Sequence, residues 1–214
     1  MTPAEASKLA GDICRLAPIM PVLVVQDAAQ AIPLAKSLIA GSLPALEVTL
    51  RTPAALDVIR AMSSLEGCAV GAGTLVTPQD VRNAKAAGAT FGVSPGTTDS
   101  LIEACLEEDL PLIPGTASAS ESMRLLERGF TVQKFFPAEA SGGAPALKAI
   151  GGPLPQISFC PTGGVSLSNA KSYLSLPNVI CAGGSWVAPE ALVSQGRWAD
   201  IEALAREASE TLSS

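Results

Sequence analysis

The 214-residue chain is 48% hydrophobic, and its 14 Lys and Arg stand against 20 Asp and Glu, a formal net charge of −6. This length suffices for one full hydrophobic core, so we expect a single domain over residues 1–214. The acidic balance, without any Lys/Arg cluster, argues against nucleic acid and anionic membranes as partners. The apolar runs are also interrupted well before the roughly 20 residues that a membrane helix needs.

The absence of histidine removes the commonest general base and the commonest metal ligand. Five cysteines occur singly, without a CxxC pair, so the sequence predicts neither a disulfide framework nor a zinc site. The first residues carry acids and helix formers, unlike a signal peptide. We therefore expect a cytoplasmic protein that needs no metal or other cofactor and uses Glu, Asp, Lys, Tyr or Cys for any chemistry.

A helix over residues 4–15 is the first predicted element, and short runs rich in β-branched residues then recur at intervals of about two dozen residues. Eight such runs are predicted strands: 19–25, 45–50, 69–74, 91–94, 110–113, 131–136, 156–160 and 179–183. Segments with helical spacing lie between most of them, as at 78–87 and 118–128. Helix starts are indicated at Thr52-Pro53 and Thr77-Pro78, and helix ends at Gly88 and Gly129.

Eight successive βα repeats predict an α/β protein of the (β/α)8 TIM-barrel type, with the N-terminal helix closing the barrel bottom. An open doubly wound sheet usually has fewer strands and a glycine-rich nucleotide loop after the first one. The segment after the first predicted strand, Val25-Gln26-Asp27-Ala28, is not such a loop. In a barrel the active site lies at the C-terminal ends of the strands, and candidate residues are sought there.

Alternation along the second predicted strand separates its two faces. Leu46, Val48 and Leu50 form the apolar set that should pack on the helices, which places Glu47, Thr49 and Arg51 on the interior side. An acid and a base on one inward face favour a functional site, and the alternative is a structural ion pair between Glu47 and Arg51.

Lys134 is the only lysine inside any predicted strand. Alternation does not decide which face of its strand is inward, and an exposed strand lysine is the alternative. Strands of a barrel are covered on both faces, which favours burial. A lysine buried against aromatic side chains loses hydration, which favours the neutral amine and lets it attack a carbonyl. The sequence therefore indicates Schiff-base chemistry.

Glycine-rich segments follow the last two predicted strands, at residues 160–165 and 182–186. Glycine lets backbone N–H groups approach an anion, and the corresponding loops of TIM barrels commonly hold phosphate. Each Gly-Gly pair alone is more often a tight turn. The ends of the third, fourth and fifth strands supply small residues that leave room for a ligand, and Thr74 adds a hydroxyl able to bind a carboxylate or carbonyl oxygen.

Five motifs in this order resemble the bacterial 2-keto-3-deoxy-6-phosphogluconate (KDPG) and 4-hydroxy-2-oxoglutarate aldolases of the Entner-Doudoroff type. The motifs are LEVTLRT at 46–52, GAGT at 71–74, SPG at 94–96, KFFPAE at 134–139 and FCPTGG at 159–164. The resemblance extends from about Pro18 to Arg206. It implies a homotrimeric class I aldolase that cleaves KDPG to pyruvate and D-glyceraldehyde 3-phosphate.

The resemblance also implies roles for individual residues. Lys134 would form the Schiff base and Glu47 would move protons. The implied substrate-binding residues are Arg51 and Thr74 at the carboxylate, Pro95, Phe136 and Thr162 in the pocket, and Gly163, Gly164, Gly184 and Ser185 at the phosphate. Three alternatives remain open: an aldolase for the 6-phosphogalactonate epimer, an aldolase for 4-hydroxy-2-oxoglutarate, and a non-catalytic barrel that binds sugar phosphates.

Overall fold

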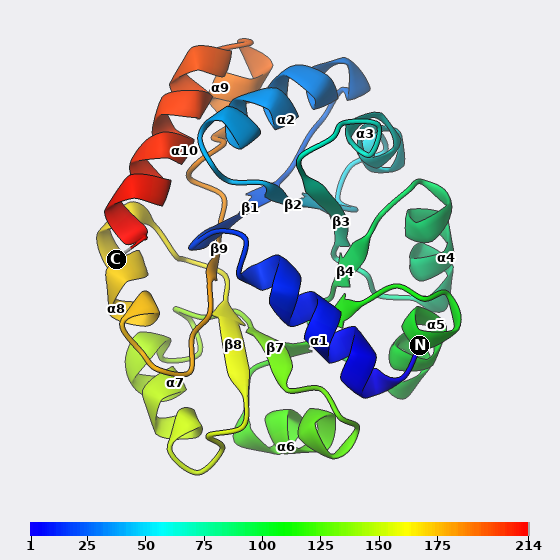
Figure 1. The fold of residues 1–214 in the computed structure, drawn as a ribbon, viewed down its shortest axis with the longest axis vertical. Coiled ribbons are helices and arrows are strands. Elements are labelled where there is room, and N and C mark those ends of the chain that lie inside the picture. Colours follow the sequence, from blue (N-terminus) through cyan, green and yellow to red (C-terminus); the bar gives the residue numbers. More distant parts are fainter. Residues whose placement is uncertain (214) are drawn as a thin grey trace.

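The computed structural model describes residues 1–213, in which parallel strands alternate with helices (Figure 1). The strands are β1 (Ile19–Leu23), β2 (Ala45–Thr49), β3 (Ala69–Gly73), β4 (Phe91–Val93), β5 (Leu112–Ile113), β6 (Gly115–Thr116), β7 (Val132–Phe135), β8 (Ser158–Pro161) and β9 (Ala182–Gly184). The helices are α1 (Pro3–Cys14), the 3-10 turn η1 (Ala28–Gln30), α2 (Ala31–Ala40), α3 (Ala55–Met62), α4 (Pro78–Ala86), α5 (Asp99–Glu107), α6 (Ala119–Glu127), α7 (Gly143–Gly151), α8 (Leu167–Leu174), α9 (Glu190–Ser194) and α10 (Trp198–Leu212).

The strands form two parallel sheets that curl around a common centre, with the helices other than α1 outside (Figure 1). One sheet has the order β5-β4-β3-β2-β1-β9, and the other has the order β6-β7-β8. Only Pro114 separates β5 from β6, because proline has no N–H to donate to a ladder. On the other side, isolated parallel bridges join Phe159 to Val179 and Thr162 to Gly183. The α/β class and the parallel, curled arrangement agree with the prediction.

Local sequence signals explain where several helices begin and end. Thr77 and Ser118 form capping boxes at the starts of α4 and α6, in which each hydroxyl accepts a hydrogen bond from an N–H of the first turn. Gly88 and Gly129 follow the helix ends with φ of 98° and 93°, a conformation that glycine adopts without steric cost.

The predicted helix start at Thr52-Pro53 is wrong. The helix α3 begins at Ala55, and its N-cap residue Ala54 offers no capping side chain. The Thr52 hydroxyl instead donates to the Val25 carbonyl oxygen at 2.6 Å, which ties the end of β2 to the end of β1. The Thr52 side chain therefore links the segments that follow two strands and does not cap the helix.

The helix α1 lies across the strands (Figure 1) and is attached to β7. The Ser7 hydroxyl accepts hydrogen bonds from the backbone N–H groups of Thr131 at 2.9 Å and Val132 at 3.0 Å. Further along the same helix, Ala10 and Cys14 are buried in a cluster with inward-facing strand residues such as Phe91. The rest of the apolar core lies between strands and outer helices.

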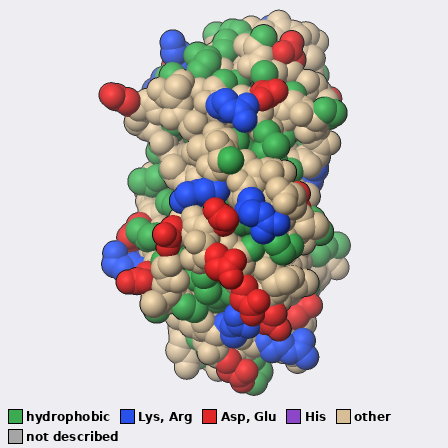
Figure 2. Space-filling view, turned by 90° about the vertical axis from the view of Figure 1, so that its right-hand side faces the viewer, with side chains coloured by type: hydrophobic (Ala, Val, Ile, Leu, Met, Phe, Trp, Pro, Cys, Tyr) green, Lys and Arg blue, Asp and Glu red, His purple; other side chains and the backbone are tan. Residues whose placement is uncertain are grey.

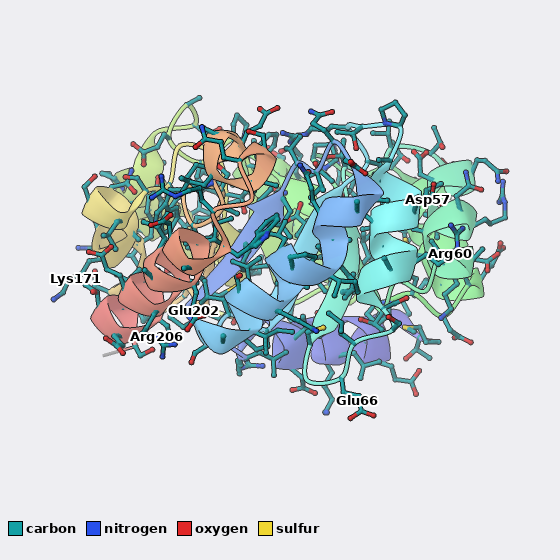
Figure 3. All side chains as sticks on the ribbon, turned by 90° about the horizontal axis from the view of Figure 1, so that it is seen from above. Asp57, Arg60, Glu66, Lys171, Glu202 and Arg206 are labelled. Carbon is teal, nitrogen blue, oxygen red and sulfur yellow. The ribbon has the colours of Figure 1, made fainter. Side chains whose placement is uncertain are left out.

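Charged side chains of both signs are interspersed on the face shown in Figure 2, without a basic patch there. Several form exposed ion pairs within one helix, including Arg60 with Asp57 on α3 and Arg206 with Glu202 on α10 (Figure 3). Such pairs contribute little to stability. Within residues 1–213 no helix is both long and apolar enough to cross a bilayer.

Candidate active site

Lys134 and Glu47 meet in the interior of the curled sheets. The Lys134 Nζ lies 3.3 Å from Glu47 Oε1, and their side chains are 5% and 2% exposed. The two residues come from different sheets, β7 and β2. The alternatives of an exposed Lys134 and of a Glu47–Arg51 ion pair are therefore wrong, because Lys134 is buried and is itself the partner of Glu47.

Strand alternation explains how both side chains come to face inward. The neighbours Leu46 and Val48 belong to the core against the helices, so Glu47 points the other way. On β7, Gln133 points outward and donates from Nε2 to two carbonyl oxygens, those of Ser122 and Phe130. Lys134 therefore faces the interior, which alternation in the sequence had left undecided.

The space for the Glu47 carboxylate exists because Gly73 has no side chain. A Cβ atom built on Gly73 would overlap Glu47 Oε1 and lie 2.7 Å from Glu47 Cγ. Burial raises the pKa of the Glu47 carboxyl above its usual value, and the Lys134 ammonium opposes that shift. A buried carboxyl with a raised pKa, beside an amine, is suited to accept and return protons. The sequence analysis did not single out Gly73, although a glycine inside a strand often marks such a close approach.

A second pair lies at the ends of β2 and β3. Arg51 Nε donates to the Thr74 hydroxyl at 3.3 Å, and Arg51 is exposed. Thr74 has a φ of 63°, in the left-handed region that a β-branched residue rarely adopts. This strained backbone turns the chain immediately after Gly73. A guanidinium beside a hydroxyl can bind a carboxylate.

Of two further predicted site residues, Phe136 lies next to Lys134, and Pro95 contacts Gly115, the ladder partner of Lys134. The ring centroid of Phe136 is 5.2 Å from Lys134 Nζ, a cation–π contact. Pro95 follows β4, and its backbone packs against Gly115. A Cβ atom built on Gly115 would overlap the Pro95 carbonyl carbon. Gly115 in turn pairs with Lys134 in the parallel ladder, and its N–H donates to the buried Ser94 hydroxyl at 3.2 Å. Ser94 thus fixes this strand end, a role that the sequence did not reveal.

The turn after β8 contains three predicted site residues in contact with neighbouring segments. Thr162 is 6% exposed, and its side chain occupies the space that a Cβ of Gly183 would need. Gly163 and Gly164 have φ of 99° and 79°, so the predicted turn is present. A Cβ on Gly163 would lie 3.3 Å from the Phe136 ring, which links this turn to the surroundings of Lys134.

The second predicted glycine turn is wrong, because Gly183 and Gly184 belong to β9 itself. These glycines are required by close packing. A side chain at Gly184 would overlap the ring of Trp186, whose Cη2 would lie 2.7 Å from the added Cβ. Ser185 follows the strand and is exposed. The sequence placed the strand too early, at 179–183, because Val179 and Ile180 favour a strand.

Fold and geometry together define the class of protein: a parallel α/β enzyme with a buried lysine–carboxylate pair inside its curled sheets, as in lyases that act through a lysine amine. Residues 11–204 match the family described as KDPG and KHG aldolase. The chain therefore belongs to the KDPG and KHG aldolase family.

Individual relatives agree with this assignment. The chain is 53% identical over 198 residues to the 2-dehydro-3-deoxy-phosphogluconate aldolase of Pseudoalteromonas atlantica, covering 92% of each chain. It superposes on the KDPG aldolase of Legionella pneumophila, captured with pyruvate as a covalent carbinolamine intermediate, with TM-score 0.90, 45% identity and coverage of 93% and 97%. The Zymomonas mobilis enzyme with 3-phosphoglycerate gives TM-score 0.89, 45% identity and coverage of 95% and 96%.

Proposed function

We propose that this chain is a class I aldolase that cleaves KDPG to pyruvate and D-glyceraldehyde 3-phosphate. The observation that carries the proposal is the buried pair of Lys134 and Glu47, 3.3 Å apart. The Legionella neighbour, which holds pyruvate as a covalent carbinolamine, supports an amine nucleophile in this family. The activity is that of a carbon–carbon lyase acting on a phosphorylated 2-keto acid.

In the proposed reaction, Lys134 Nζ attacks the C2 ketone, and loss of water gives an iminium. Glu47, through a water, takes the proton of the C4 hydroxyl. The C3–C4 bond then breaks, its electron pair enters the enamine, and glyceraldehyde 3-phosphate leaves. Protonation of C3 and hydrolysis of the iminium release pyruvate and restore the amine.

The other residues bind and orient the substrate in this proposal. Arg51 and Thr74 hold the carboxylate next to the reacting ketone. Pro95, Phe136 and Thr162 line the pocket around it. Backbone N–H groups of the Gly163–Gly164 turn, with Gly184 and Ser185, bind the phosphate; the positive φ values of Gly163 and Gly164 favour such an anion site.

We further propose that the two sheets form one closed (β/α)8 barrel within a single domain over residues 1–214. The support is that β5 and β6 are continuous apart from Pro114, and that bridges connect β8 with the β9 segment. In this barrel α1 closes the bottom, since Ala10 and Cys14 are buried among inward-facing residues. The site then lies at the C-terminal ends of the strands.

The proposed enzyme uses no metal or other cofactor, acts in the cytoplasm and assembles as a homotrimer without nucleic-acid or membrane partners. Excess EDTA should leave cleavage unchanged, and zinc-dependent recovery after EDTA would contradict the scheme. Light scattering should give three times the 21.7 kDa of the chain. A monomeric mass would remove the trimer from the proposal.

Reductive trapping tests the nucleophile. Incubation with pyruvate and borohydride should attach one reduced pyruvate per chain, on the peptide that contains Lys134. Lys134→Met should form no adduct and lose cleavage. Lys171→Met is the matched control, because Lys171 on α8 points outward (Figure 3). An adduct at another lysine would overturn the assignment, and no adduct would favour a non-catalytic sugar-phosphate-binding barrel.

A second activity, on 4-hydroxy-2-oxoglutarate, is favoured by the family name, which covers both substrates. Values of kcat/KM for KDPG, its 6-phosphogalactonate epimer and 4-hydroxy-2-oxoglutarate, measured side by side, rank the three candidates. A larger kcat/KM for the epimer or for 4-hydroxy-2-oxoglutarate would replace KDPG as the principal substrate.

A further inference from the structure

The segment that follows β7 supports the Gly163–Gly164 turn from outside. The backbone N–H of Glu139 donates to the Gly163 carbonyl oxygen at 3.0 Å, and the N–H of Ala138 donates to that of Thr162 at 2.8 Å. These two hydrogen bonds fix Glu139 alongside the turn.

The side chain of Glu139 fills the space beside the turn. A Cβ atom on Gly164 would lie 2.6 Å from Glu139 Cγ and 2.7 Å from Glu139 Cβ. The carboxylate continues away from the turn, towards α7, because a Cβ on Gly143 would lie 3.5 Å from Glu139 Oε1. The aliphatic part of Glu139 therefore packs on Gly164, while its charge lies on the far side.

Tyr173 holds the carboxylate in that place. Its hydroxyl donates to Glu139 Oε1, and its side chain, on α8, is fully buried in the apolar core. Burial, together with the Glu139 carboxylate, raises the pKa of the Tyr173 hydroxyl, so it remains a donor at neutral pH. Because packing fixes the ring, the hydroxyl is a fixed anchor.

A second contact from α8 reaches the same turn. Asn169 Nδ2 donates to the Gly164 carbonyl oxygen at 3.0 Å, and its Oδ1 accepts from the Ser166 N–H at 2.8 Å. The turn is thus held from its outer side by a backbone contact, a packing contact and a side-chain hydrogen bond. None of these groups contacts Lys134 or Glu47 in the hydrogen bonds and ion pairs of residues 1–213.

We propose that Glu139 and Tyr173 are a positioning pair that sets selectivity for phosphorylated substrates. The proposal rests on the proposed function, in which the Gly163–Gly164 turn binds phosphate. The pair keeps the Gly163–Gly164 turn in its left-handed conformation before the anion binds. Binding therefore costs little conformational entropy in the turn. The pair also directs a carboxylate away from an anion site, where a free Glu139 would repel phosphate.

Tyr173→Phe tests this directly, because it keeps the ring and removes only the hydroxyl. We expect KM for KDPG to rise about tenfold, the size expected for losing one hydrogen bond to a charged group. The value of kcat, KM for the unphosphorylated 4-hydroxy-2-oxoglutarate, and reductive trapping with pyruvate should stay within about twofold. Glu139→Gln keeps an acceptor for the Tyr173 hydroxyl, so its KM for KDPG should stay close to the wild-type value. Glu139→Ala removes the acceptor and should raise KM for KDPG as Tyr173→Phe does.

Ser7→Ala is the control for a general loss of stability, because it also removes a buried hydroxyl but lies on α1. It should leave both KM values unchanged. Equal changes for phosphorylated and unphosphorylated substrates in Tyr173→Phe, or no change for either, would overturn the positioning role.

Titration with inorganic phosphate separates this inference from the proposed function. The Kd of phosphate should rise about tenfold in Tyr173→Phe, as for KM. If the wild type cleaves KDPG but its phosphate Kd equals that of the variant, the inference fails and the function stands. If the wild type binds phosphate about tenfold more tightly than the variant, but neither cleaves KDPG, the function fails and the positioning role stands.

Discussion

Gly73, which has no side chain, leaves the space in which the side chain of Glu47 lies. The carboxylate occupies the volume that any other residue at position 73 would fill. Because Glu47 is buried and paired with Lys134, it has little freedom to move aside. A change at Gly73 should therefore act on the chemistry through Glu47.

We expect Gly73→Ala to lower kcat by about a hundredfold, since a misplacement of about 1 Å in a reacting group has this effect. Pyruvate trapping at Lys134 should persist. Gly152→Ala is the matched control, because a Cβ there would lie 3.6 Å from the nearest atom, the Ala149 carbonyl oxygen. Steady-state kinetics of both variants measures this effect. An unchanged kcat in Gly73→Ala would show that the contact with Gly73 does not determine the position of Glu47.

The pH dependence of kcat/KM should report Glu47. Burial raises its pKa above 4.5, and only the carboxylate can accept a proton. As pH falls, kcat/KM should therefore begin to decrease at a pH above 4.5, because Glu47 becomes protonated at a higher pH than an ordinary carboxyl does. Glu47→Gln should remove this limb and lower kcat by about 10²–10⁴. An identical acid limb in the variant would assign the titration to another group.

At this scale the sequence predicts which face Glu47 occupies, because Leu46 and Val48 define the other face. It does not predict the partner. Lys134 is 87 residues away, and its distance from Glu47 depends on how the sheets curl. The roles of Gly73 and Ser94 depend on contacts between strands, which composition and spacing do not contain.

Helix starts differ in how far the sequence predicts them. Ser118 and Thr77 have an acidic residue three positions later, which completes the capping box. Thr52 lacks such a residue, since position 55 is Ala, and its hydroxyl bonds to Val25 instead. The sequence is equally ambiguous at the β9 glycines. A Gly-Gly pair is found both in turns and in closely packed strands, and the sequence does not distinguish the two.

The capping box of α6 should make stability depend on pH. Hydrogen bonds from Ala117 and Ser118 lower the pKa of Glu121 below 4.5. The folded-state pKa is depressed, so the stabilisation is present above the unfolded-state pKa and is lost as pH falls through the folded-state pKa. Glu121→Gln should cost about 0.5 kcal/mol at pH 7, and the difference from wild type should vanish in acid. Urea unfolding at several pH values measures it, and a pH-independent difference would contradict this origin.

At the scale of the molecule, eight predicted strands correspond to segments of the two sheets, and the sequence therefore predicts the α/β class and the parallel order. The predicted strand 110–113 ends just before Pro114, and the second short strand after it, β6, was not predicted. A proline can lie at a strand end or interrupt a strand, and only the neighbouring ladders distinguish these cases. Likewise, the N-terminal helix was predicted from its own composition, but its attachment through Ser7 depends on β7.

Ser7→Ala tests how much that attachment contributes. The buried N–H group of Val132 and the partly buried N–H group of Thr131 would lose their hydroxyl acceptor. We expect the free energy of unfolding to fall by about 1–3 kcal/mol, with kcat unchanged. Urea denaturation measures the loss, and Ser64→Ala on the exposed surface is the control. Equal stability of the two variants would mean that α1 is held by apolar packing alone.

Pro114 also has a mechanical consequence. The strand on its N-terminal side pairs with β4, and the strand on its C-terminal side pairs with β7, so the two sheets meet at a residue that cannot donate a hydrogen bond. Glu47 belongs to the six-stranded sheet and Lys134 to the three-stranded one. The distance between carboxylate and amine is therefore set by how the two sheets are joined. On one side the Pro114 carbonyl oxygen accepts a hydrogen bond from the Lys134 N–H at 2.8 Å, and on the other side the bridge between Thr162 and Gly183 links the sheets.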